Sequence, residues 1–89
     1  MNLWVNKMLP TLRHKHDEKW LEERFSDLIR ITGIKHASAV AAKYSSVYAE
    51  VYESTEEGHK KNNRARYEAN QRLVNLIKKL QAKAVEPIA

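Results

Sequence analysis

The clearest pattern in the chain is an apolar stripe between Ala37 and Glu53. Its members recur at steps of three and four, which places them on one face of a helix with about 3.6 residues per turn. They fall within an arc of roughly 140°, and a strip of small side chains lies beside it. The pattern predicts a central helix over residues 36 to 54 that packs against two neighbours. Its apolar face consists of Ala37, Val40, Ala41, Tyr44, Val47, Tyr48, Val51 and Tyr52.

Two further apolar stripes flank the central one. The first lies in residues 16 to 32, where the carboxylate of Asp17 can cap free amide hydrogens at the start of a helix. Gly33 can adopt the left-handed conformation that closes a helix, so we expect this helix to end at Thr32. The second stripe lies in residues 60 to 84. The side chains expected to be buried are Trp20, Leu21, Phe25, Leu28, Ile29 and Thr32 in the first helix, and Ala65, Ala69, Leu73, Leu76, Ile77, Leu80 and Ala84 in the last.

The segment from Ser54 to Asn63 contains no apolar residue and separates the last two helices. Two starts for the last helix are open. Ser54 and Glu57 fit the capping-box pattern, in which a hydroxyl and a carboxylate satisfy free amides reciprocally. Gly58 would then cost about 1 kcal/mol inside the helix. Asn62 or Asn63 as a later cap is the alternative.

Residues 1 to 15 predict a short N-terminal helical element that Pro10 interrupts. Its most informative residue is Trp4. This side chain either folds back as a lid on the core or stays exposed as an anchor for a partner, because tryptophan is favoured at binding hot spots. At the other end of the chain, Pro87 is expected to stop the last helix, which leaves residues 85 to 89 as a frayed tail.

These elements predict an all-α fold: a three-helix bundle with a long antiparallel helical hairpin, formed by the second and third helices, and a short N-terminal helical element. Short connections between helices usually produce antiparallel neighbours. The chain has only two glycines and two prolines, which disfavours strands joined by tight turns. Its 89 residues are expected to form one domain, 1 to 89, with the helical core at 16 to 84.

The composition is that of a globular protein, with 43% hydrophobic and 30% charged residues. No apolar run is long enough to span a bilayer, and residues 1 to 12 lack the hydrophobic stretch and cleavage site of a secretion signal. The chain contains no cysteine, so it has neither a disulfide framework nor a thiolate metal site. We therefore expect a cytoplasmic protein that does not contact a membrane.

The net charge of +5 is concentrated in the last predicted helix. Residues 59 to 84 contain eight Lys or Arg against one acid, Glu68, whereas residues 1 to 58 contain eight against nine. Six of these cations fall on an arc of about 120° beside the apolar stripe. The arc is either a plain solvated face, a surface that tracks phosphates or a membrane-surface helix, and the last is disfavoured because the stripe lacks Trp and Phe. Acids of the first helix, from Asp17 to Asp27, complement this charge, although exposed ion pairs contribute only about 0 to 1 kcal/mol.

Three tyrosines, Tyr44, Tyr48 and Tyr52, lie four residues apart along one edge of the central helix. Aromatic platforms beside basic residues bind single-stranded nucleic acid by stacking on its bases. The other interpretation is a helix interface, which suits tyrosine because its ring is buried while its hydroxyl reaches water. The same segment loosely resembles a helix-turn-helix, but the apolar stripe continues through Ser45 without a phase shift, so we expect no turn there.

Nothing in the chain is typical of an enzyme. It has no glycine-rich phosphate loop and no nucleophile paired with a histidine. No two of its four histidines have the i, i+4 spacing with a glutamate that a zinc enzyme would show. We therefore expect no catalytic residue, no metal and no cofactor.

The sequence favours a small non-enzymatic regulatory or interaction module that offers a helical surface to a protein partner. The alternative is a nucleic-acid-binding protein that uses the basic face of the C-terminal helix. A homodimer is also expected, because three helices of unequal length leave apolar surface uncovered. The residues expected to contact a protein partner or nucleic acid are Lys60, Lys61, Arg64, Arg72, Lys78, Lys79 and Trp4.

Overall fold

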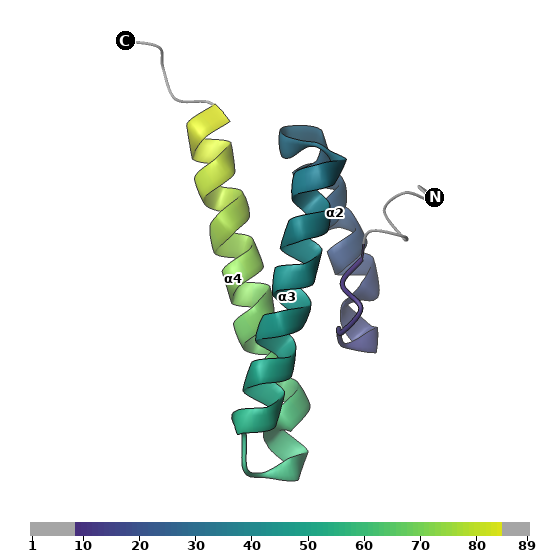
Figure 1. Ribbon diagram of the computed structural model, residues 1–89, viewed down its shortest axis with the longest axis vertical. Coiled ribbons are helices and arrows are strands. Elements are labelled where there is room, and N and C mark those ends of the chain that lie inside the picture. The colour runs from purple at the N-terminus through teal and green to yellow at the C-terminus, as the bar shows by residue number, and fades with distance from the viewer. Residues whose placement is uncertain (1–8, 85–89) are drawn as a thin grey trace.

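The computed structural model of the protein describes residues 9 to 84, and this range contains three long helices and no strand. They are α2 (Glu18–Thr32), α3 (Ile34–Ser54) and α4 (Lys61–Ala84), with the single 3₁₀ turns η1 (Lys15–Asp17) and η2 (Gly58–Lys60) before α2 and α4. α3 and α4 form an antiparallel hairpin, and α2 packs along it (Figure 1). The predicted all-α bundle is confirmed. Trp4 and the predicted frayed tail lie outside the described residues.

A single residue, Gly33, joins α2 to α3. Its φ of 91° is one that side chains rarely adopt, and its ψ of 166° differs from the left-handed helical value that we predicted. The Gly33 amide donates to Ile29 O at 2.8 Å, and the Gly33 carbonyl accepts from Ala37 N at 3.1 Å. Gly33 therefore closes one helix and opens the next, which lets the chain reverse with almost no loop.

The connection between α3 and α4 contradicts both predicted caps. Ser54 is the last residue of α3, and its hydroxyl donates backwards to Val51 O at 3.2 Å instead of capping the next helix. Asn62 and Asn63 both lie inside α4, which begins at Lys61 after η2. The turn η2 contains Gly58, so the glycine falls before the α-helix and its helix-breaking cost is avoided.

The hydrophobic core lies where the three helices meet. α2 contributes its large side chains, with Leu21, Phe25 and Leu28 fully buried. α4 contributes Ala65 and Ala69 on the half nearer the loop, and small side chains at a contact allow two helices to pack closely. The remaining buried apolar residues are Ala37, Ala41, Tyr44, Val47, Tyr48, Leu73 and Ile77. α3 runs without interruption past Ser45, so the chain has no helix-turn-helix there.

Candidate functional site

The uncovered side of the hairpin carries a shallow groove between α3 and α4. It encloses about 60 Å³, and its surface is almost entirely apolar. All of its lining residues come from these two helices, so α2 does not cover it. We call it the α3–α4 groove, and it is lined by Val40, Lys43, Tyr44, Val47, Ala69, Arg72, Leu73 and Leu76.

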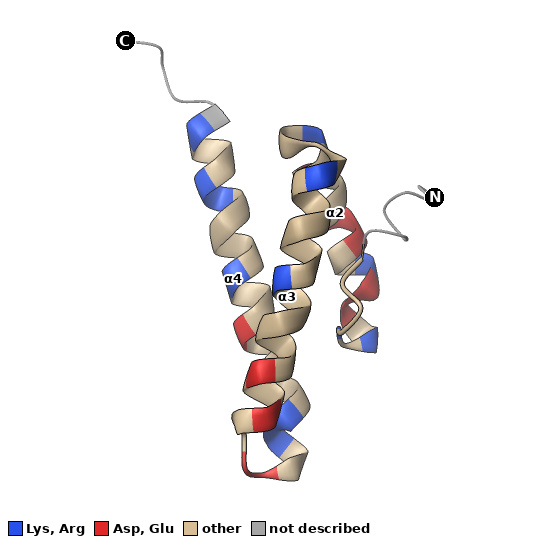
Figure 2. Ribbon diagram, viewed as in Figure 1, with Lys and Arg blue, Asp and Glu red and all other residues tan. Residues whose placement is uncertain are grey.

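Two cations, Lys43 and Arg72, stand at the rim of the α3–α4 groove. Both side chains are exposed, and neither belongs to an ion pair within residues 9 to 84. The wider charge distribution is uneven along the hairpin. Figure 2 shows Lys and Arg on the parts of α3 and α4 far from the connecting loop, whereas residues of both signs, including most of the acids of α3 and α4, lie closer to the loop. The groove therefore has an apolar floor, with two cations at its rim.

The cationic stripe predicted for the last helix is divided into two groups. Lys60, Lys61 and Arg64 lie near the loop, whereas Arg72, Lys78 and Lys79 lie exposed on the other half of α4. Between the two groups is an acid, Glu68, which lines the same hollow as Arg64. The stripe is thus not one continuous positive surface.

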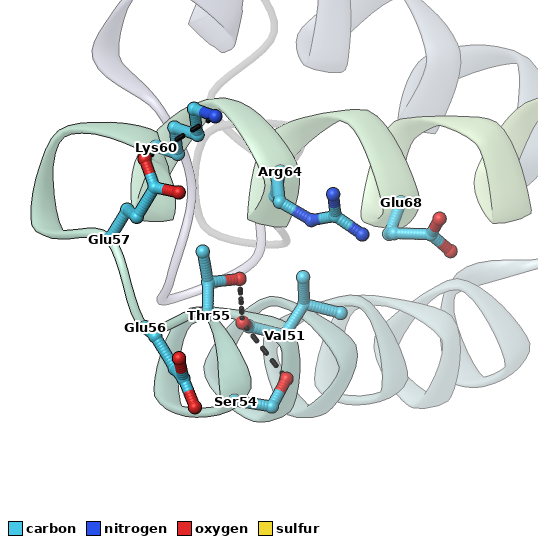
Figure 3. Close-up of a pocket in the computed structure, with 8 residues that line it drawn as sticks. All are labelled: Val51, Ser54, Thr55, Glu56, Glu57, Lys60, Arg64 and Glu68. Carbon is cyan, nitrogen blue, oxygen red and sulfur yellow. Dashed lines mark hydrogen bonds and ion pairs between the residues drawn. The ribbon is translucent and has the colours of Figure 1, made fainter.

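The cations near the loop have local partners. Lys60 Nζ is 3.3 Å from Glu57 Oε2, and Lys61 Nζ donates to Tyr52 O at 3.0 Å while lying 5.3 Å from the centre of the Tyr52 ring. A polar hollow of about 420 Å³ lies beside them (Figure 3). Its lining mixes both signs of charge and consists of Val51, Ser54, Thr55, Glu56, Glu57, Lys60, Arg64 and Glu68. This end of the hairpin does not present a purely cationic surface.

A network of polar side chains lies on the covered side of the bundle. The carboxylate of Asp17 is 7% exposed and accepts hydrogen bonds from Arg66 Nε at 3.1 Å and Arg66 Nη2 at 2.5 Å. Asn70 Nδ2 donates a third at 3.0 Å, and Asn70 Oδ1 accepts one from the Tyr44 hydroxyl. Charge-assisted bonds of this kind are stronger than neutral ones. The network ties η1 to both helices of the hairpin.

Asp17 was predicted to cap the first helix, and that prediction is wrong. No side-chain capping bond forms at the start of α2. The carboxylate turns towards α4 because the bidentate guanidinium of Arg66 and the Asn70 amide offer more charge-assisted bonding than free amide hydrogens do. Neither Arg66 nor Asn70 was predicted as a functional residue.

The network fixes the protonation states of its members. Burial alone would raise the pKa of Asp17, but the hydrogen bonds from Arg66 and Asn70, with the charge of Arg66, lower it overall. The hydrogen bond to Asp17 raises the pKa of Arg66. Burial raises the pKa of Tyr44 and of Tyr48, because a phenolate is poorly solvated there. Near neutral pH the network holds one ion pair and neutral phenols, which suits a structural role.

The sequence left open whether the three tyrosines belong to the core or to the surface, and the structure places two in the core and one at the surface. Tyr44 and Tyr48 are buried, with ring centres 6.5 Å apart, and the Tyr48 hydroxyl donates to Asn62 Oδ1 at 3.0 Å. Tyr52 is 38% exposed. A stacking platform needs several accessible rings in a row, so this series does not form one.

The other acids of α2 do not complement α4 as predicted. Within residues 9 to 84, Asp27 pairs with Arg24 at 3.7 Å and with Arg30 at 2.7 Å, and Glu23 pairs with Arg24 at 3.8 Å. Of the acids from Asp17 to Asp27, only Asp17 forms an ion pair with α4 among the described residues. The apolar contacts of α2 therefore decide its packing, and one partly buried ion pair, between Asp17 and Arg66, adds to them.

Comparisons with protein-family models, with curated proteins and with solved structures find no significant match to this chain. None of the helices within residues 9 to 84 is both long and apolar enough to cross a membrane.

Proposed function

We propose that the protein is a non-enzymatic interaction module that binds a helical segment of a partner protein in the α3–α4 groove. The supporting observation is an apolar groove that α2 does not line, in which Val40 and Leu76 stay half-buried, with two exposed cations at its rim, Lys43 and Arg72. An amphipathic helix that lays its apolar face into a groove between two helices is a common mode of peptide recognition. The third helix to occupy this side of the hairpin would come from the partner.

The chemistry of the groove defines the partner segment. Apolar side chains at i, i+3 or i+4, and i+7 would contact the two half-buried residues of the floor, Val40 and Leu76. Acidic side chains beside that stripe would meet the two rim cations, which raises the association rate and selects against basic helices. The expected ligand is therefore an acidic amphipathic helix.

A direct test uses a fluorescein-labelled synthetic peptide of that pattern, with Leu at the apolar positions and Glu beside them. We expect saturable binding by fluorescence anisotropy, and a loss of affinity of about ten-fold or more in the variant Lys43→Glu with Arg72→Glu. A peptide with Lys in place of Glu is the ligand control. The variant Lys15→Glu with Lys19→Glu reverses two exposed charges away from the groove and is the matched protein control.

The outcomes are distinct. Equal affinity of the two double variants for the acidic peptide, or equal affinity of the wild type for both peptides, would contradict the proposal. Both double variants change exposed residues, so their melting temperatures should match that of the wild type. A measured loss of binding then reports on the groove and not on the fold.

Nucleic-acid binding is the second candidate, and the exposed group Arg72, Lys78 and Lys79 favours it, because none of the three forms an ion pair within residues 9 to 84. Each phosphate contact on duplex DNA adds about 0.9 to the slope of log affinity against log salt. All six predicted cations acting together would give a slope of about 5. Changing Arg64 and Arg72 to Gln would then lower it by about 2. The protein-partner proposal expects feeble DNA affinity near physiological salt and no such slope.

A further inference from the structure

The face that contains the α3–α4 groove carries charge in a fixed order along both helices. On α3, exposed Lys43 precedes exposed Glu50 by seven residues, which is two turns or about 10 Å. On α4, Glu68 precedes exposed Arg72 by four residues, about 6 Å. Because the helices are antiparallel, both acids lie towards the connecting loop and both cations lie away from it.

The boundary between the two signs crosses the groove at its middle. Val47 lies between Lys43 and Glu50 in α3, Ala69 lies between Glu68 and Arg72 in α4, and both line the groove. Arg64 lines the same hollow as Glu68 and offsets part of its charge, which leaves Glu50 as the clearest acid of the face. The face therefore has a positive half and a less strongly negative half on either side of an apolar centre.

We infer that, in the free protein, a second copy of this chain occupies this face in an antiparallel, face-to-face arrangement. A twofold axis that lies in the plane of the interface and crosses both helices packs α3 against α3 and α4 against α4. It brings Lys43 of each copy towards Glu50 of the other, and Arg72 towards Glu68. A twofold axis parallel to the helices would instead place cations over cations, which is repulsive. Symmetric pairs with self-complementary surfaces are the commonest soluble oligomers.

This inference rests on the proposed function, because it names an occupant for the surface assigned there. It also adds regulation. A dimer of this kind covers the groove, so an acidic partner helix has to displace the second copy before it can bind. Binding of the acidic peptide should then weaken as the protein concentration rises above the dimer dissociation constant.

Charge reversal tests the pairing by sedimentation. We expect the wild type to form dimers at about 100 µM, with dissociation promoted by salt. The variants Lys43→Glu with Arg72→Glu and Glu50→Lys with Glu68→Lys should each be monomeric, whereas an equimolar mixture of the two should form a heterodimer. A monomeric wild type, or a mixture that stays monomeric, would overturn the inference.

A cross-link tests the geometry independently, because the chain has no cysteine of its own. Ser46 is exposed and lies midway between Lys43 and Glu50, close to the proposed axis. Ser46→Cys should form a disulfide-linked dimer on mild oxidation, with the fraction falling as salt is raised. Ser38→Cys, exposed on another side of α3, is the matched control and should stay monomeric. Equal cross-linking of both variants would contradict the arrangement.

Failure of this inference can be separated from failure of the proposed function. The wild type could be monomeric and still bind the acidic peptide, with binding lost in the variant Lys43→Glu with Arg72→Glu. That result would contradict the dimer and support the groove as a partner site. Conversely, the mixture could form a heterodimer while the monomeric variant Glu50→Lys with Glu68→Lys fails to bind the peptide. That result would support the dimer and contradict the partner helix.

Discussion

The two sides of the α3–α4 hairpin differ in how their polar groups are satisfied. On the covered side, Asp17 and Arg66 form an ion pair that Asn70 completes, and the nearby apolar side chains are buried. On the open side, Lys43 and Arg72 flank an apolar groove without an ion-pair partner among residues 9 to 84. We therefore expect substitutions on the covered side to change the stability of the fold, and substitutions on the open side to change association with a partner or a second copy.

The largest effect is expected where α2 enters the core. Phe25→Ala removes a fully buried ring and should cost about 3 to 5 kcal/mol, enough to unfold much of so small a domain at 37 °C. Tyr67→Ala is the control, because Tyr67 is 65% exposed. Thermal melts followed by circular dichroism measure both variants. Equal melting temperatures would show that α2 does not seal this side of the hairpin.

The next effect concerns the ion pair on the covered side. Asp17→Asn leaves the Arg66 guanidinium without its counter-charge and should cost about 2 kcal/mol, since Arg66 is partly exposed and the full penalty of a buried charge does not apply. Arg30→Gln breaks the exposed contact with Asp27 and should cost less than about 1 kcal/mol. Urea unfolding gives both values. If the exposed pair contributes as much as the covered one, the distinction between the two sides fails.

A smaller difference is expected within the tyrosine series. Tyr44→Phe removes the hydrogen bond to Asn70 and should lower the free energy of unfolding by about 1 kcal/mol. Tyr52→Phe changes an exposed ring and should alter it by less than about 0.5 kcal/mol. The two variants, compared by urea unfolding at pH 7, report on the same substitution in two environments. A reversed order would contradict the assignment of Tyr44 to the core.

The last effect is the pH dependence of the covered network. Because folding lowers the pKa of Asp17, this group stabilises the fold above its unfolded pKa of about 3.9, and the stabilisation is lost as pH falls through the folded pKa. The difference in unfolding free energy between the wild type and Asp17→Asn should therefore narrow in acid. Because folding raises the pKa of Tyr44, the neutral phenol stabilises the fold below its unfolded pKa of about 10, and this stabilisation is lost as pH rises further. The loss should not occur in Tyr44→Phe. Urea midpoints across pH would test both branches, and parallel curves would contradict them.

The helices were predictable from the sequence because their apolar stripes keep a constant phase, and because Gly33 interrupts the chain where one stripe ends. The start of α4 was not predictable from the sequence. In η2 the amide of Lys61 donates to the carbonyl of Gly58, and no side chain caps the turn. Asn70 is a polar residue in phase with the apolar stripe of the last helix, and this pattern indicates a polar contact inside the bundle. Asn70 is half-buried and needs hydrogen-bond partners, which Tyr44 and Asp17 supply, whereas Asn62 is exposed and accepts from Tyr48.

The candidate site was only partly predictable. Arg72 was predicted as a contact residue and lies at the groove, but Lys43 was not, because the predicted cationic contacts were limited to the last helix. Arg66 was missed because its importance depends on Asp17, which is distant in sequence. Helical periodicity reports which side chains share a face of one helix, and it contains no information about which face of another helix they meet.

The ion pair between Asp17 and Arg66 joins residues that are 49 positions apart, and this separation has a consequence for the order of assembly. The α3–α4 hairpin closes over a few residues, so its contacts need little loop-closure entropy and can form early. The ion pair between Asp17 and Arg66 can form only after the hairpin has brought α4 into place. Unfolding should run in the opposite order, so η1 and the start of α2 should detach before the hairpin opens. Amide hydrogens in that segment should then exchange with solvent faster than those at the centre of α3.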